Sequence, residues 1–222
     1  MMIFPGFARL WFSGLLGLIL SFTLIPITYS QADGVNTDNP TKMLEVVSKR
    51  TLEKIRRDRS MLEENPEGLK KIIRDEIFPY IDRVRMAQWA LGKHWRRATR
   101  EQRMAFAREF QDLLLRTYAT ALLKYIDAEI EFLPGKLVPG DRQAIVRSEV
   151  NLKSSPKPVS INYRLYLSNN QWRVFDISIE DVSLIASYRT TFSREIRQQG
   201  ITGLIESLHQ RNQEEPEKSS KG

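Results

Sequence analysis

Hydrophobic residues along the chain recur first at helical spacing, then at alternate positions, and then at helical spacing again. In residues 42–64 they fall on one side of a helix, which Pro66 ends. The spacing predicts a second helix over residues 67–82, broken or bent at Pro79, and a short third helix that ends near Gly92. The chain is therefore predicted to open with helices.

The clearest helical segment begins at Thr99. Thr99 and Gln102 are the residue types of a capping box, in which each side chain accepts a hydrogen bond from the other residue's backbone N–H. The pattern that follows predicts an amphipathic helix of about seven turns. Its apolar face is formed by Phe106, Phe110, Leu113, Leu114, Tyr118, Ala121, Leu122 and Tyr125.

From residue 128 the hydrophobic residues alternate, which is typical of strands with one buried face. Asn169 and Asn170 indicate a tight turn, so the strands are expected to form an antiparallel meander. Helical spacing returns at Val182, Gly200 suits a helix end, and a last helix is predicted from about residue 202 to 210. The four predicted strands are residues 128–133, 142–152, 158–167 and 171–180.

The order of helices, sheet and helices favours an α+β fold. We expect a four-stranded antiparallel sheet with helices packed on one face. At this level the apolar residues fit either a filled core or a core that surrounds an apolar cavity, because the two share the same periodicity.

The first 32 residues are predicted to be a secretory signal peptide. Residues 10–27 are apolar and uncharged, Arg9 precedes them, and Ser30 and Ala32 fit a small-residue cleavage site. The alternative is an uncleaved membrane anchor, because the apolar run is nearly long enough to span a bilayer. A single domain is then expected over residues 33–210. Residues 211–222 are charged and predicted to be disordered.

Composition limits the chemistry and the partners. The chain has no cysteine, so disulfides, thiolate metal sites and a thiol nucleophile are excluded. Removal of Arg9, the only charged residue in the leader, reduces the net charge from +7 to +6. A basic secreted domain could meet an anionic membrane or nucleic acid, but secretion argues against nucleic acid. The basic segment 93–103 is a candidate docking surface.

The sequence offers little that resembles a catalytic or metal site. The two histidines, His94 and His209, have no carboxylate at ligand spacing, so we expect no metal site. No nucleophile-elbow motif and no phosphate-binding glycine loop occurs. Asp176, inside an apolar strand, could act as a general base in a small cone-shaped α+β enzyme. The structural alternative is a carboxylate that hydrogen-bonds the backbone, Tyr188 or Arg189.

Several stretches, taken in order, resemble the MlaC family of periplasmic phospholipid-binding proteins, also known as toluene-tolerance proteins. They are "MAQWALGKHWRRATREQRMAFAREFQDLL" with "RTYATALLKY", then "WRVFDISIEDVSLIASYRTTF", then "QQGITGLIESL". The resemblance covers roughly residues 40–210. The chain departs from it at Asp181, where the family commonly has glycine.

The resemblance implies a non-enzymatic carrier without a cofactor, whose cargo is a phospholipid held by its acyl tails in an apolar cavity between sheet and helices. It implies two partners: a lipoprotein–porin complex at the outer membrane, and an inner-membrane ABC transporter complex with a ring-shaped lipid-binding subunit. The carrier would shuttle lipid between them in the periplasm and maintain outer-membrane asymmetry. The expected lipid-binding residues are Phe110, Leu114, Tyr118, Leu122, Val146, Val150, Ile161, Tyr163, Phe175, Ile177, Leu184 and Tyr188.

Overall fold

The structure, a computed structural model, describes residues 38–214 except residues 125, 136, 139 and 153–154. The predicted signal peptide, with its alternative as a membrane anchor, and residues 215–222 of the predicted tail lie outside the described residues. Within the described part, no helix combines the length and the hydropathy needed to cross a membrane.

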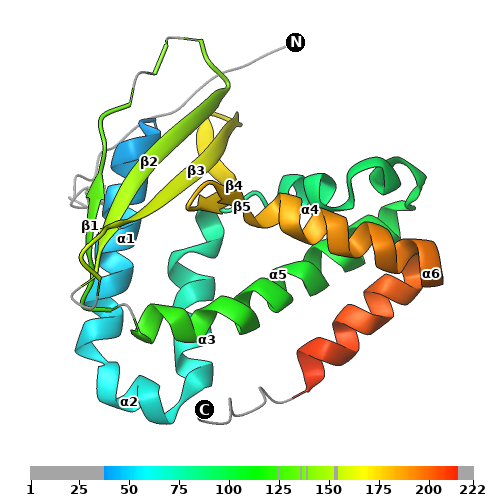
Figure 1. Cartoon of the computed structure of the whole chain (residues 1–222), viewed down its shortest axis with the longest axis horizontal. Helices are drawn as coiled ribbons and strands as arrows, with labels where there is room; N and C mark the ends of the chain where they lie inside the picture. Colours follow the sequence, from blue (N-terminus) through cyan, green and yellow to red (C-terminus); the bar gives the residue numbers. More distant parts are fainter. Residues whose placement is uncertain (1–37, 125, 136, 139, 153–154, 215–222) are drawn as a thin grey trace, which may run out of the picture. The chain divides into compact units, whose positions relative to one another are not determined.

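The described chain has helices first, then one sheet, then a long last helix, which confirms the α+β class (Figure 1). The first helices are α1 (Pro40–Arg57), α2 (Arg59–Glu64), α3 (Pro66–Glu76), α4 (Arg83–Leu91) and α5 (Arg100–Lys124), with 3-10 turns η1 (Phe78–Tyr80) and η2 (Gly92–Arg97). The strands are β1 (Glu129–Phe132), β2 (Gln143–Asn151), β3 (Val159–Ser168), β4 (Gln171–Ile179) and β5 (Val182–Ser183), and α6 (Leu184–Gln213) follows them.

Local signals explain most of the helix ends. The predicted capping box is confirmed: the Gln102 backbone N–H donates to the Thr99 hydroxyl at 3.2 Å, and the Thr99 N–H donates to the Gln102 side-chain oxygen at 3.0 Å. Helix α4 ends at Gly92, whose φ is 53°. The predicted helix over residues 42–64 is wrong in one respect, because Asp58, at φ −103° and ψ 13°, divides it into α1 and α2.

The last helix extends beyond the predicted boundary of the disordered tail. Helix α6 continues to Gln213, and two residues of its final turn are held by hydrogen bonds. The Arg211 guanidinium donates to Glu195 at 2.6 Å, and the Asn212 amide donates to the backbone oxygen of Glu109 at 2.9 Å. The predicted tail therefore begins too early in the sequence.

The sheet is antiparallel with the order β1-β2-β3-β4-β5. The meander of four strands is present, and the two-residue β5 makes it a five-stranded sheet, since a pairing this short leaves no alternation in the sequence. Asn169 and Asn170 form the predicted tight turn with φ of 50° and 58°. Glu180 and Asp181 form a second such turn with φ of 49° and 62°. Glycine is favoured at such a φ, so Asp181 adopts a backbone conformation that non-glycine residues rarely take.

A β-bulge in β4 changes which residues share a face. Arg164 pairs with Asp176, whereas the next residue, Leu165, pairs with Val174, so Phe175 is the extra residue. Simple alternation would place Phe175 and Ile177 on the same face. With the bulge, Ile177 shares its face with Val174, and Asp176 shares the opposite face with Arg164.

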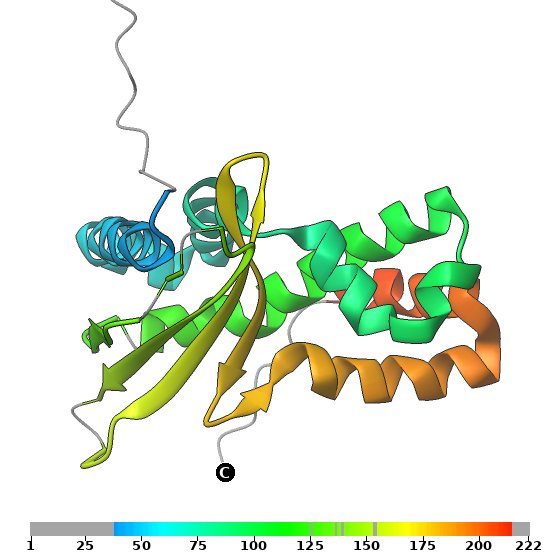
Figure 2. The ribbon, with the colours of Figure 1, turned by 90° about the horizontal axis from the view of Figure 1, so that it is seen from above.

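The two faces of the sheet have different neighbours. Residues of α1 pack on one face, which we call the inner face, against Val146, Leu165 and Val174. Figure 2 shows α1 beside the sheet, with α4 and α6 beyond the β4 edge. On the opposite, outer face, the Arg164 guanidinium lies 5.1 Å from the ring of Trp89 in α4. The expectation that helices pack on one face only is therefore too simple.

Among the described residues, most of the buried apolar side chains fall into three clusters. The α4–α6 cluster contains Met86, Ala87, Ala90, Leu91, Phe106, Ala107, Phe110, Leu113, Ile185, Phe192, Leu204 and Leu208. The α3–α5 cluster contains Ile55, Leu62, Leu69, Ile72, Ile73, Leu115, Ala119 and Ile126. The sheet cluster contains Met43, Leu44, Val47, Val146, Leu165, Trp172 and Val174.

Candidate functional site

Half-buried apolar side chains border all three clusters, and we call this set the apolar border. Each of these side chains packs against a cluster and keeps part of its surface accessible. The set belongs to the connection between α3 and α4, to α5, to the inner face of the sheet and to α6. It consists of Ile77, Phe78, Tyr80, Ile81, Leu114, Leu122, Leu123, Phe132, Ala144, Tyr163, Leu167, Ile177, Tyr188, Ile196 and Ile205, together with Trp95 of η2.

The connection between α3 and α4 reaches all three clusters. Ile77 and Phe78 pack against the α3–α5 cluster, whereas Ile81 packs against both other clusters. The backbone fixes this position: Ile81 forms a parallel bridge with Val174, and the N–H of Asp82 donates to the Val174 oxygen at 2.8 Å. The sequence-based prediction missed these residues, because Pro79 interrupts the helical spacing that would have revealed them.

The inner face of the sheet presents Tyr163 at the apolar border. Every residue of the central strand β3 except Leu165 keeps some exposed surface. Burial raises the pKa of Tyr163, while a hydrogen bond with Ser148, itself buried, lowers it. The Tyr163 side chain thus keeps some exposed surface although its hydroxyl is desolvated.

On the helical side, the border is formed around Tyr188. Its ring lies 5.1 Å from Phe110 and 5.4 Å from Phe192, centroid to centroid. Burial, together with the neighbouring Tyr118 to which it is hydrogen-bonded, raises the pKa of Tyr188 to about 12. A hydrogen bond with Thr117 and the charge of Arg211 lower this pKa in part, so the Tyr188 hydroxyl has polar neighbours beside the aromatic rings.

The other predicted residues are distributed differently. Val146 and Val150 are fully buried, and Ile161 shares the inner face with Tyr163. Leu184 is half-buried at the start of α6, and none of the three described clusters contains it. The structure therefore brings most of the predicted residues to the inner face or the helical side of the border.

Phe175 does not join them. Its ring lies 5.6 Å from Trp89 and 5.2 Å from the Arg164 guanidinium, which is on the outer face. The physical reason is the β-bulge, which shifts the alternation of β4 at this residue. A sequence pattern carries no sign of such a shift.

Asp176, the candidate general base, is engaged in structural hydrogen bonds. It is 3% exposed, and its oxygens accept from the Ser183 hydroxyl at 2.8 and 3.0 Å and from the Ile185 N–H at 3.3 Å. Ser183 in turn caps α6 by accepting from the Ala186 N–H at 3.0 Å. This network connects β4 to the first turn of α6, which supports the structural interpretation over the catalytic one.

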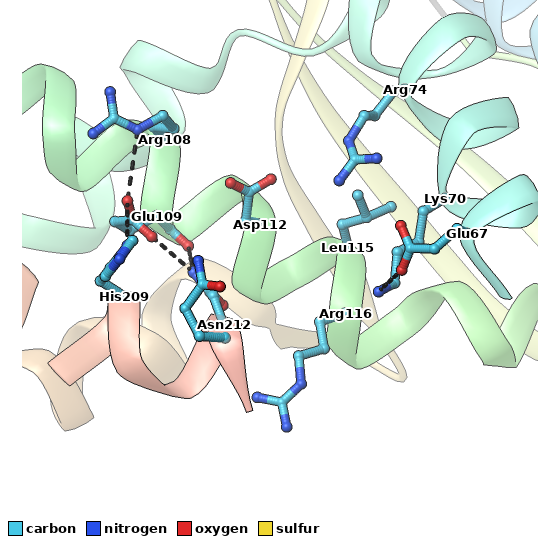
Figure 3. A pocket seen from close by; sticks show the side chains of 11 residues that line it. Glu67, Lys70, Arg74, Arg108, Glu109, Asp112, Leu115, Arg116, His209 and Asn212 are labelled. Atoms are coloured by element: carbon cyan, nitrogen blue, oxygen red, sulfur yellow. Dashed lines mark hydrogen bonds and ion pairs between the residues drawn. The ribbon is translucent and has the colours of Figure 1, made fainter. Parts of the chain in front are cut away.

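A polar pocket of about 380 Å³ lies between α3, α5 and the end of α6 (Figure 3). The buried carboxylate of Glu109 is 3.3 Å from His209 Nδ1 and 3.1 Å from the Asn212 side-chain amide. Burial raises the pKa of nearby Asp112, whereas the Arg74 charge lowers it. No sequence pattern indicates this pocket, because it depends on which helix faces meet.

The predicted apolar cavity is not among the pockets described. Besides the polar pocket, a recess of about 190 Å³ lies on the outer face of the sheet, and we call it the outer recess. Phe175 is the one predicted lipid-binding residue that lines either of them. The cavity therefore stays a prediction. The outer recess is lined by Gln143, Ile145, Arg164 and Phe175, and also by Leu165, which belongs to the sheet cluster on the inner face, and Ala144, which packs against that cluster.

Among the described residues, no group of three or more His, Cys, Asp and Glu side chains is placed to hold a metal ion. His94 is buried, its Nε2 has no partner in the described chain, and burial lowers its pKa. The neighbouring positive charges of Lys93, Arg97 and Arg197 lower that pKa further. His94 is thus favoured in its neutral form.

These features define a single-sheet α+β domain whose described buried apolar residues form three clusters. Comparison with known proteins then identifies the family. The sequence model of the family described as MlaC protein matches residues 45–210, and the chain belongs to this family.

Individual relatives agree with this assignment. The chain is 22% identical over 90% of its length to the Haemophilus influenzae intermembrane phospholipid transport system binding protein MlaC, of which it covers 92%. It is 21% identical over 84% of its length to toluene tolerance protein Ttg2D from Pseudomonas putida, of which it covers 83%. A solved structure of a phospholipid-binding protein from Ralstonia solanacearum, in complex with a phospholipid, matches with a TM-score of 0.70 and 31% identity. That match covers 76% of this chain and 94% of the other.

Proposed function

We propose that this protein is a phospholipid carrier that holds acyl tails at the apolar border. The observation that supports this most directly is the set of half-buried apolar residues that pack against the three clusters, with Ile81 packing against two of them. An acyl chain among these residues would cover the apolar surface that they keep accessible. Membership of the MlaC family and likeness to a lipid-bound structure support the same function.

The carrier is proposed to act in the periplasm, without a cofactor or catalysis, after cleavage of residues 1–32. Its partners would be the outer-membrane lipoprotein–porin complex and the inner-membrane ABC transporter complex with its ring-shaped subunit. Shuttling between them would maintain the lipid asymmetry of the outer membrane. The basic composition, +7 over the whole chain, suits work near anionic lipid surfaces.

The energetics of acyl burial constrain the mechanism. Each methylene moved from water into an apolar site contributes about 0.8 kcal/mol, so two tails with about thirty methylenes gain on the order of 20 kcal/mol. Release of such a lipid into water would be too slow to be useful. Transfer is therefore expected only while the carrier is docked on a partner that offers another apolar site. Because the energy comes from the tails, headgroup discrimination should be weak.

A transfer assay tests this function. The carrier, loaded with a fluorescent phospholipid, is mixed either with buffer or with the purified inner-membrane complex. We expect the lipid to stay bound in buffer and to transfer when the complex is present. Loss of the lipid at the same rate in both mixtures would contradict a docked hand-over, and failure to load any phospholipid would contradict the carrier itself.

A further inference from the structure

The outer face of the sheet carries arginines that are stacked on aromatic rings. The guanidiniums of Arg164 and Arg189 lie 5.1 and 5.6 Å from the ring of Trp89. Those of Arg85 and Arg142 lie 3.5 and 5.3 Å from the ring of Tyr166. We call these two groups the arginine stacks.

Stacking on a ring orients these side chains, although Arg85 is also ion-paired with Asp82 at 3.3 Å. Arg189 donates through Nε to the Trp89 backbone oxygen at 2.7 Å, and among the described residues neither it nor Arg142 forms an ion pair. Arg164 approaches one carboxylate, that of Asp176 at 3.8 Å, whose oxygens already accept from Ser183. A guanidinium held by a ring loses little further entropy when its N–H edge pairs with an external carboxylate or phosphate.

The outer recess lies beside the first stack. Its lining includes Phe175, which is 2% exposed, Ile145, which is 58% exposed, and Arg164 from the stack itself. Its volume of about 190 Å³ suits one apolar side chain of a partner. A concave apolar spot bordered by fixed cations is the complement of a protruding apolar residue flanked by acids.

This shape favours a protein segment over a lipid bilayer. Membrane anchors protrude and insert aromatic or aliphatic side chains below the headgroups. Here the guanidiniums of Arg164 and Arg189 both lie against the Trp89 ring. The apolar surface next to this ring is the outer recess, which is concave and does not protrude. A bilayer surface would leave the recess unfilled, whereas a peptide side chain would fill it.

We infer that the outer face binds an acidic segment of a partner protein, whose carboxylates pair with the arginine stacks while one apolar side chain enters the outer recess. This inference rests on the proposed carrier function, because the partner is taken to be one of the two membrane complexes. It places docking on the face opposite to the inner face, so binding a partner would not compete with bound lipid.

The test measures binding of the mature chain to each purified membrane complex and, separately, to vesicles of phosphatidylglycerol and phosphatidylcholine. Arg142→Glu with Arg164→Glu should weaken binding to at least one complex by about tenfold or more, because each fixed charge pair is reversed. Arg142→Lys with Arg164→Lys should also weaken this binding. Lysine keeps the positive charge but lacks the planar guanidinium that stacks on a ring and donates paired hydrogen bonds to a carboxylate. Ile145→Ser should weaken binding by emptying one wall of the recess.

Arg194→Glu with Arg197→Glu provides the control, since it makes the same charge change at exposed positions of α6. Lipid extracted from each variant distinguishes the docking surface from the carrier function. A variant that retains its lipid but no longer binds a complex supports the docking surface. Normal binding of the Arg142, Arg164 and Ile145 variants to both complexes would overturn the proposed docking surface. Binding of the wild-type chain to vesicles, if the same variants abolished it, would also overturn this proposal. A wild-type chain that carries lipid but binds neither complex would contradict the proposed partners and this surface together. Loss of binding on reversal of Arg96 and Arg97, with the sheet variants unaffected, would assign docking to segment 93–103 instead.

Discussion

At the scale of single residues, Asp176 shows how a buried carboxylate can serve structure. Its oxygens accept hydrogen bonds from the Ser183 hydroxyl and the Ile185 N–H, and so hold the first turn of α6 against β4. Charge-assisted hydrogen bonds of this kind are stronger than neutral ones. The residue is therefore expected to matter for stability and not for chemistry.

Asp176→Asn tests this expectation. Asparagine keeps an acceptor but removes the charge, so we expect the free energy of unfolding to fall by about 1–3 kcal/mol in denaturant titrations. The lipid extracted per folded chain should not change. Asp141→Asn, the same substitution at an exposed loop position, should leave stability almost unchanged. An Asp176→Asn protein of full stability that no longer handled lipid would favour the enzyme hypothesis.

Asp112 makes the opposite contribution. Burial raises its pKa above the usual 3.8, so the folded protein binds its proton more tightly than the unfolded chain does. When the pH is above the folded pKa, the ionised Asp112 carboxylate therefore destabilises the fold. This destabilisation disappears when the pH is below the unfolded pKa. We expect Asp112→Asn to raise the melting temperature at neutral pH and to change nothing below pH 3.8.

Asp75 offers a control of opposite sign. A hydrogen bond from Lys71 lowers its pKa, so its stabilising effect is present above the unfolded pKa and is lost as the pH falls. Asp75→Asn should therefore lower stability slightly at neutral pH. If both substitutions moved the melting temperature in the same direction, the assigned environment of Asp112 would be wrong.

At the scale of elements, the kink in α6 depends on one glycine. Gly200 has φ 75° and ψ 178°, a conformation that is essentially restricted to glycine. A Cβ added there would meet nothing within 4 Å, so its cost would be conformational and not steric. The kink allows Leu204 and Leu208, beyond it, to reach the α4–α6 cluster.

Gly200→Ala is accordingly expected to lower the free energy of unfolding by about 1–3 kcal/mol. Thermal or chemical denaturation measures the loss, and hydrogen exchange should show it in the last part of α6. Gln198→Ala, at an exposed helical position nearby, serves as the comparison and should be nearly neutral. A Gly200→Ala variant as stable as wild type would mean that α6 does not need this kink.

Elements with local signals could be predicted from the sequence, and those set by tertiary contacts could not. The capping box at Thr99 and the turn at Asn169 depend on residues that are close together in the sequence, and both were predicted. The break at Asp58 and the bulge at Phe175 leave no local trace, because what surrounds the chain decides them. The candidate site divides in the same way. Periodicity placed Leu114, Leu122, Tyr163 and Ile177 on apolar faces, whereas the position of Ile81 and the polar pocket depend on how elements meet.

At the scale of the whole described domain, the apolar border is the feature on which the carrier function depends. Leu114 in α5 is half-buried beside the α4–α6 cluster. Tryptophan there would occupy space that an acyl chain is proposed to use. We expect Leu114→Trp to reduce the phospholipid recovered per chain, while lipid-free stability changes by no more than about 1–3 kcal/mol.

Met104→Trp is the matched control on the same helix, because Met104 is 41% exposed and outside the border. Phospholipid in an organic extract is quantified for both variants. Equal recovery from Leu114→Trp and wild type would place the tails elsewhere.

Phospholipid bound at the apolar border is the basis of the proposed carrier function. Native mass spectrometry of the mature chain, purified without detergent, followed by lipid analysis of an organic extract, measures this binding. We expect a folded species carrying about one phospholipid per chain, with acyl tails protected from solvent. A stably folded chain that carries no lipid after the same purification, and takes up none from phospholipid vesicles, would contradict the carrier function.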